Sequence, residues 1–178
     1  TNIDDPSEFF QTAIYTGTGS SQAITNNGNS DMQPDWVWIK SRNRTSWHSL
    51  HDSSRGSTKG LFTNDANPEV DHADSVTSFN SDGFTLGADS SGGSVNVNTG
   101  TYVGWQWKAS GTTSSNTDGN ITSTVQANTD AGFSIVTWTG NEQSAASLGH
   151  GLGVKPDVVI FKNRSTAYNW IVYLGALG

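Results

Sequence analysis

A ten-residue pattern that occurs twice limits what this chain can fold into. It runs from Pro34 to Asn43 and again from Pro156 to Ser165, and in both copies Pro, Asp, Lys and Arg surround a four-residue apolar run. Side chains alternate along a strand, so one face of the first copy carries two tryptophans and the other carries Val37 and Ile39. Both faces are largely apolar, which predicts an inner strand covered on both sides.

The repetition extends beyond this strand. Three aligned pairs, at offsets of 122 or 123 residues, are Phe10 with Phe133, Pro34 with Pro156, and Trp47 with Trp170. The second copy stops before any counterpart of the segment from Leu61 to Lys108. A half-sandwich exposes strand edges and an apolar face, so we expect either a piece of a longer protein or a partner that completes the core. We favour the piece of a longer protein, because the last residues carry no stop-like feature.

Short apolar and aromatic runs, separated by Gly, Ser, Asn and Pro, indicate strands along the chain, and no stretch of ten residues has the 3.6-residue period of a helix. The pair Asp82-Gly83 between two such runs is a strong hairpin signal. We therefore predict an all-β fold. Residues 1–108 would form an antiparallel β-sandwich or jelly-roll-like module with an N-terminal leader, 109–120 a Ser/Thr/Gly linker, and 121–178 a partial second copy of the module.

Composition excludes several partners. Only 14% of the 178 residues are charged, the net charge is −7, and the nine Lys and Arg are scattered, so we expect no nucleic-acid binding. The same acidity argues against docking on an anionic membrane, and no apolar run is long enough to insert into one. The chain has no Cys, which excludes disulfides and thiolate metal sites.

Four segments together resemble a family of virion proteins of tailed bacteriophages, common in marine phages and usually described as tail-fibre or structural proteins. The segments are Phe10–Gly17, Gln33–Lys40, Ser78–Phe84 and Tyr102–Lys108. Gly149 to Pro156 resembles the start of the next module in the same proteins. The resemblance implies tandem β-sandwich modules on a phage particle, made in the host cytoplasm, and it supplies no catalytic residues.

The candidate site residues are few. Trp47 and His48, beside a polar corner, are the candidates for contact with a glycan, whereas we expect the side chains of Trp36, Trp38, Trp105 and Trp107 to pack in the core. His48, His51 and Asp52, with nearby serines, have the residue types of a Ser/His/Asp site, but triads are recognised by geometry and there is no Gly-x-Ser-x-Gly elbow. We expect no catalytic residues, metal or cofactor.

Two weaker signals remain open. The loop carboxylates Asp71, Asp74, Asp82 and Asp89 lack the spacing of a calcium loop, although an irregular site is an alternative. The recurring pairs Lys40 with Lys162 and Arg42 with Arg164 indicate a structural corner, with a shared interface contact as the alternative.

These observations predict a non-enzymatic virion structural protein, a tail-fibre or appendage module involved in assembly and host-surface attachment. By analogy with tail fibres, which are typically trimers, we expect a homo-oligomer bound to other virion proteins. A glycan-binding, lectin-like module and a capsid decoration or adaptor protein are the alternatives. A depolymerase is the weakest one, because no acid pair can be identified.

Overall fold

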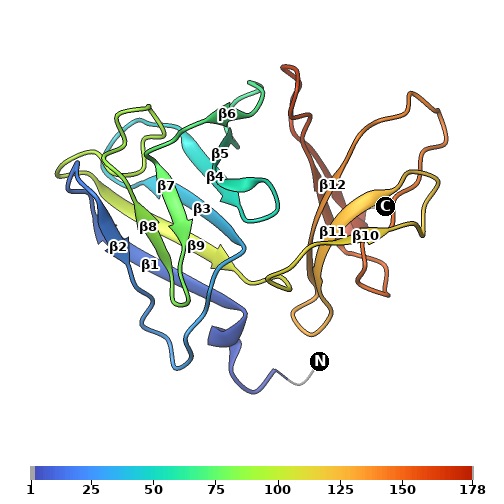
Figure 1. Cartoon of the computed structure of the whole chain (residues 1–178), viewed down its shortest axis with the longest axis horizontal. Helices are drawn as coiled ribbons and strands as arrows, with labels where there is room; N and C mark the ends of the chain where they lie inside the picture. The colour runs from blue at the N-terminus through green and yellow to red at the C-terminus, as the bar shows by residue number, and fades with distance from the viewer. Residues whose placement is uncertain (1–2, 178) are drawn as a thin grey trace.

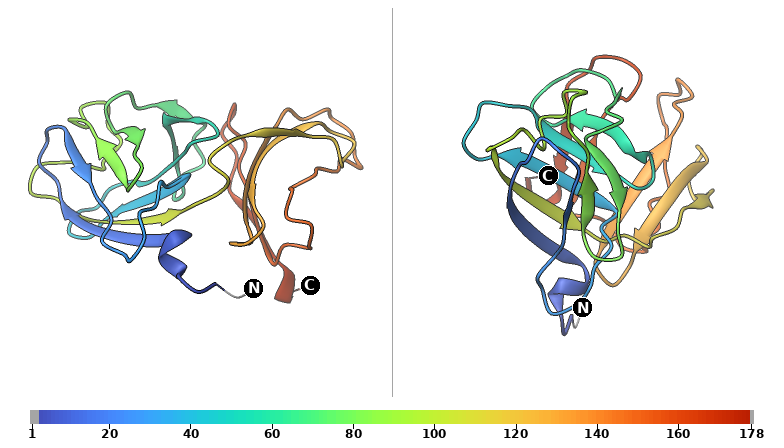
Figure 2. Two further views of the ribbon diagram at one scale, coloured as in Figure 1. Left: turned by 60° about the horizontal axis from the view of Figure 1, so that its bottom comes forward. Right: turned by 60° about the vertical axis from the view of Figure 1, so that its left-hand side comes forward.

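The computed structural model describes residues 3–177 and is built from antiparallel β-sheets. Two short 3-10 helices, η1 (Pro6–Glu8) and η2 (Gly175–Leu177), lie near its ends. The strands fall into two parts, which lie side by side in Figures 1 and 2 and are called here unit one (β1 to β9) and unit two (β10 to β14). None of the described helices is long and apolar enough to cross a membrane.

Unit one contains a six-stranded sheet in the order β1-β9-β3-β4-β5-β6. Its strands are β1 (Phe10–Thr16), β3 (Trp36–Ser41), β4 (His48–Asp52), β5 (Gly56–Phe62), β6 (Val70–Asp71) and β9 (Thr101–Trp107). The predicted inner strand is β3, which pairs with β9 on one side and β4 on the other. β9 is itself central, because it pairs with both β1 and β3 along almost its whole length.

A smaller sheet covers one face of this sheet and completes a β-sandwich-like unit. Its order is β2 (Gln22–Ile24), β8 (Phe84–Leu86) and β7 (Val76–Phe79). The buried cluster between the sheets includes Val37 and Ile39 from β3, Phe84 and Leu86 from β8, and Tyr102 from β9. The predicted hairpin is confirmed, since Asp82-Gly83 joins the antiparallel strands β7 and β8.

The tryptophan prediction needs correction. Trp36, Trp38, Trp105 and Trp107 do not lie in this core but on the opposite face of the large sheet, where each is half-buried. Their rings pack on one another, with centroids 4.6 Å apart for Trp36 and Trp107 and 5.4 Å for Trp38 and Trp105. Phe133 of unit two lies 6.2 Å from the Trp36 ring. The strand alternation was predicted correctly, but which face meets the second sheet depends on long-range contacts.

Unit two contains two separate antiparallel sheets. One has the order β10 (Ser114–Asn116), β11 (Ser123–Asn128) and β12 (Phe133–Trp138), and the other is the hairpin of β13 (Val158–Phe161) and β14 (Ile171–Leu174). The predicted linker over 109–120 is therefore partly wrong, because β10 lies within it and pairs with β11. Backbone pairing with β11 gives this Ser-rich segment a partner that composition alone does not reveal.

Candidate functional site

The predicted glycan-contact residues lie at the edge of unit one that faces unit two. Trp47 precedes β4, is 41% exposed, and stacks on the Phe62 ring at 5.0 Å with an interplanar angle of 24°. The His48 backbone N–H donates to the Asn64 side-chain oxygen at 2.8 Å. Partial burial, helped by the charge of Lys40 on the neighbouring strand, lowers the pKa of His48. Trp47 thus offers a flat, accessible ring.

A shallow hollow lies close to these two residues, between the units. It measures about 270 Å³ and is lined by Thr63, Asn64, Asp65, Ala66, Asn169 and Trp170. Asn64 links the hollow to His48 through the backbone hydrogen bond just described. Amide and carboxylate side chains beside an indole ring can bind sugar hydroxyls and stack on a sugar face.

The Ser/His pair that the sequence contains is formed, but it is sealed off. The Ser49 hydroxyl lies 3.0 Å from His51 Nε2, and His51 Nδ1 donates to the Ser57 carbonyl at 2.7 Å. Both side chains are fully buried, and burial lowers the pKa of His51 to about 3. Asp52 does not orient this histidine, because its carboxylate accepts from Arg55. The arrangement is a neutral, structural hydrogen-bond chain.

The four loop carboxylates are used separately. Asp71 pairs with Lys59, Asp82 accepts from the Met32 N–H, and Asp89 accepts from Ser75, Val95 and Asn96. Asp74 accepts from the N–H and hydroxyl groups of Ser90 and Ser91, and these hydrogen bonds lower its pKa. In the described chain no three His, Asp or Glu side chains converge to hold a metal.

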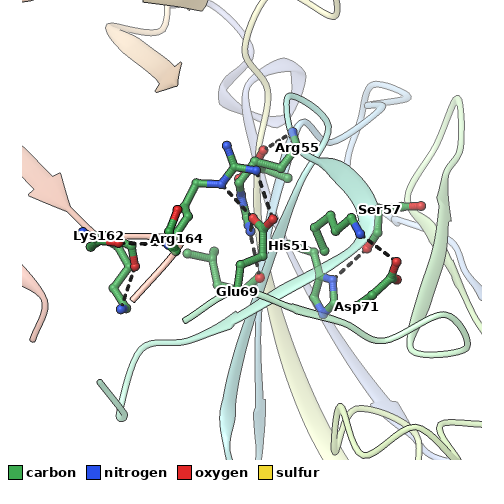
Figure 3. A network of polar contacts seen from close by, with 12 residues as sticks. His51, Arg55, Ser57, Glu69, Asp71, Lys162 and Arg164 are labelled. Carbon is green, nitrogen blue, oxygen red and sulfur yellow. Dashed lines mark hydrogen bonds and ion pairs between the residues drawn. The ribbon is translucent and has the colours of Figure 1, made fainter. Parts of the chain in front are cut away.

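An ion network connects the two units (Figure 3). The Arg55 side chain is only 3% exposed and contacts Asp52 at 2.5 Å and Glu69 at 2.9 Å. Glu69 also accepts from Arg164 of unit two at 2.9 and 3.0 Å. Burial opposes the ionisation of Glu69, but hydrogen bonds and charge from Arg164 and Arg55 outweigh it and lower the pKa of the carboxyl. Arg164 of unit two thus makes a bidentate contact with Glu69, which is itself paired with the buried Arg55 of unit one.

A second connection is centred on Asp35, which is 1% exposed. Its carboxylate accepts from Ser53 Oγ at 2.7 Å and from Gln126 Nε2 of unit two at 2.8 Å. The backbone N–H groups of Ala109 and Gly111 donate to it at 2.8 and 3.2 Å. One buried carboxylate therefore holds the turn after β4, the segment after β9, and β11 together.

A third connection runs from the loop between β13 and β14 to carbonyl groups of unit one. Trp170 Nε1 donates to the Phe62 and Asp65 carbonyls at 2.9 and 3.1 Å, and Lys162 Nζ donates to the Ala66 carbonyl at 3.0 Å. Of the recurring corner residues, Lys162 and Arg164 are therefore interface contacts. The sequence singled them out by recurrence, whereas Gln126 and Glu69 gave no signal, because neither belongs to the repeated pattern.

The fold and this junction define an all-β protein of two antiparallel units joined by buried hydrogen bonds and ion pairs. Residues 5–178 match the model of a family described as a domain of unknown function (DUF7483), and the chain belongs to that family. Comparison with curated proteins and with solved structures gives no match.

Proposed function

We propose that this chain is a non-enzymatic structural protein of a bacteriophage virion, a tail-fibre or appendage module that takes part in assembly and host-surface attachment. The junction between the units is the observation that carries the proposal. Asp35 and Glu69 each hold groups from both units, and both carboxylates are largely buried. Such a junction fixes the relative orientation of two β units, as an appendage under mechanical force requires.

The proposal includes a repeated architecture, in which unit two is a partial copy of unit one. Several contacts recur at an offset of 122 residues. The Ser53 N–H donates to the Asp35 carbonyl at 2.8 Å, and the Gly175 N–H donates to the Asp157 carbonyl at 2.6 Å. β3 pairs with β4, and β13 with β14, in the same register at that offset. This register aligns Trp170 with His48 rather than with Trp47, which refines the alignment expected from the sequence.

The position of this chain on the phage particle tests the proposal. An antibody raised against the 178-residue chain is applied to phage particles purified from the source culture and viewed by immunogold electron microscopy. We expect label on tails or tail appendages. Label on capsid faces instead would favour the decoration or adaptor alternative. Particles without label, from a lysate that contains the chain, would refute the virion assignment.

Self-association is part of the same proposal. Fibre proteins form symmetric oligomers, and the edge strand β1 of unit one exposes the apolar side chains of Phe10 and Ile14. We expect the full-length virion protein to sediment as a homo-oligomer, a trimer by analogy with tail fibres. Sedimentation as a clean monomer would count strongly against a fibre.

Glycan binding is the second candidate, and the surface around Trp47 favours it. The exposed Trp47 ring stacks on Phe62, and Asn64, which lines the hollow together with Asn169, accepts from the backbone N–H of the next residue, His48. On an array of bacterial envelope polysaccharides we expect binding that Trp47→Ala reduces about fivefold or more, since stacking on aromatic faces contributes about 1 kcal/mol beyond buried area. Tyr168→Ala, which removes an exposed ring of unit two instead, is the matched control. Absence of binding to any host polysaccharide would remove this candidate.

A further inference from the structure

Strands β13 and β14 expose apolar side chains at positions that are covered in unit one. At the 122-residue offset Ile160 corresponds to Trp38 and Val172 to Leu50. Ile160 and Val172 are each 53% exposed, whereas Trp38 is half-buried and Leu50 is 4% exposed. Exposed strands of this composition are sites for pairing with another chain.

The neighbours of these strands show which pairing of unit one has no counterpart in the described part of unit two. In unit one, β9 lies between β1 and β3 and pairs with both. By sequence, the counterpart of β1 is β12 and the counterpart of β3 is β13. These two strands belong to different sheets of the described chain. β12 pairs with β11 on one side and β13 pairs with β14 on one side. Each therefore has one edge without a strand, and these are the edges that β9 occupies in unit one.

The aspartate of the repeated pattern shows the same difference. Asp35 is buried because the chain leaving β9 donates two backbone N–H groups to its carboxylate. Asp157, its counterpart, is exposed. In addition, Trp138 of β12 reaches the ring of Phe161 on β13, with centroids 6.2 Å apart. The corresponding ring in unit one, Tyr15, stacks instead on Tyr102 of β9 at 5.1 Å.

We propose that unit two binds an extended polypeptide strand of the β9 type between β12 and β13, antiparallel to both. The recognised chemistry is that of Thr101–Trp107: an aromatic ring to stack on Trp138, a small residue beside Phe161, and further aromatic side chains on the face shared with Val158 and Ile160. Backbone hydrogen bonds to two strand edges supply affinity, and the side-chain alternation supplies specificity. The donor is a separate segment of polypeptide, not the β9 of a second copy, because that strand is already paired on both edges.

A synthetic peptide with the sequence of residues 100–109 tests the inference when it is titrated into the intact 178-residue chain. Hydrogen–deuterium exchange followed by mass spectrometry reports where it binds. We expect slower exchange in the segments that contain β12 and β13, with β1 and β3 unchanged, and no effect of a scrambled peptide of the same composition. Ile160→Lys should weaken peptide binding about tenfold or more, because a charge would lie under the incoming strand.

Val97→Lys is the matched control, since Val97 is also exposed but lies in unit one. Peptide binding that Ile160→Lys and Val97→Lys affect equally would overturn the inference, as would protection of β1 alone or no binding at all. A dimer in sedimentation whose interface protects β12 and β13 would also overturn it, because a second copy would then fill the site. The inference rests on the repeated architecture proposed above, but strand binding is measured on the isolated chain and virion location on particles, so each can fail without the other.

Discussion

At the scale of single residues, the buried His51 makes the stability of unit one depend on pH. Burial lowers its pKa from 6.5 to about 3, and the nearby Arg55 and His72 act in the same direction. Between those values the unfolded chain binds a proton that the folded chain does not. The contribution of His51 to the free energy of unfolding therefore falls as pH decreases from about 6.5 to about 3, by about 1.4 kcal/mol per pH unit.

His51→Gln should remove most of this slope. Urea unfolding of both proteins at several values between pH 7 and pH 4 provides the measurement. The variant should be less stable at pH 7 by about 2 kcal/mol, because Ser49 and the Ser57 carbonyl lose well-placed partners. His48→Gln, at a half-exposed position, is the control and should change the slope much less. Equal slopes for wild type and His51→Gln would contradict the assignment.

At the scale of elements, the ion network predicts unequal roles for two arginines. Arg55 is buried between Asp52 and Glu69, whereas the Arg164 side chain is 42% exposed. Arg55→Ala leaves two carboxylates without their buried cation and should lower the free energy of unfolding by about 3 kcal/mol. Arg164→Ala removes a partly solvated contact and should lower it by less than about 1 kcal/mol. Chemical denaturation measures the loss of stability in both variants. A larger loss for Arg164→Ala than for Arg55→Ala would show that the Arg164–Glu69 contact contributes more to stability than the exposure of Arg164 suggests.

Individual strands also show which elements the sequence was able to predict. The strand over Trp36–Ser41 and the hairpin at Asp82-Gly83 were predicted from alternation and turn chemistry, and both form. The strand β10 was missed, because Ser114–Asn116 has no apolar side chain and is specified by its pairing with β11. Local pattern determines a strand when one of its faces is apolar, whereas pairing partners determine the polar ones.

At the scale of the whole molecule, we expect the Asp35 carboxylate to hold the two units together. Asp35→Ala removes the acceptor of Gln126 Nε2 and of the Ala109 and Gly111 N–H groups, and it should lower the free energy of unfolding by about 3 kcal/mol. The segment after β9 would lose its anchor, so limited proteolysis should cut the variant between residues 109 and 113 well before wild type. Asp157→Ala, the exposed counterpart, should stay within about 0.5 kcal/mol of wild type. Identical digestion patterns for Asp35→Ala and wild type would rule out this role.

The sequence by itself determined the all-β class, the positions of the main strands and the recurrence of the pattern around Pro34 and Pro156, because these depend on side-chain alternation and turn residues that are local in the chain. It also singled out Trp47 as the tryptophan most exposed to solvent among those compared, and this side chain is 41% exposed. Only the tertiary structure decided that the Trp36 face turns away from the core, that Asp35 binds Gln126, and that Glu69 bridges two arginines. Asp35 and Gln126 are 91 residues apart, and such contacts depend on how sheets meet in space, which no local pattern encodes.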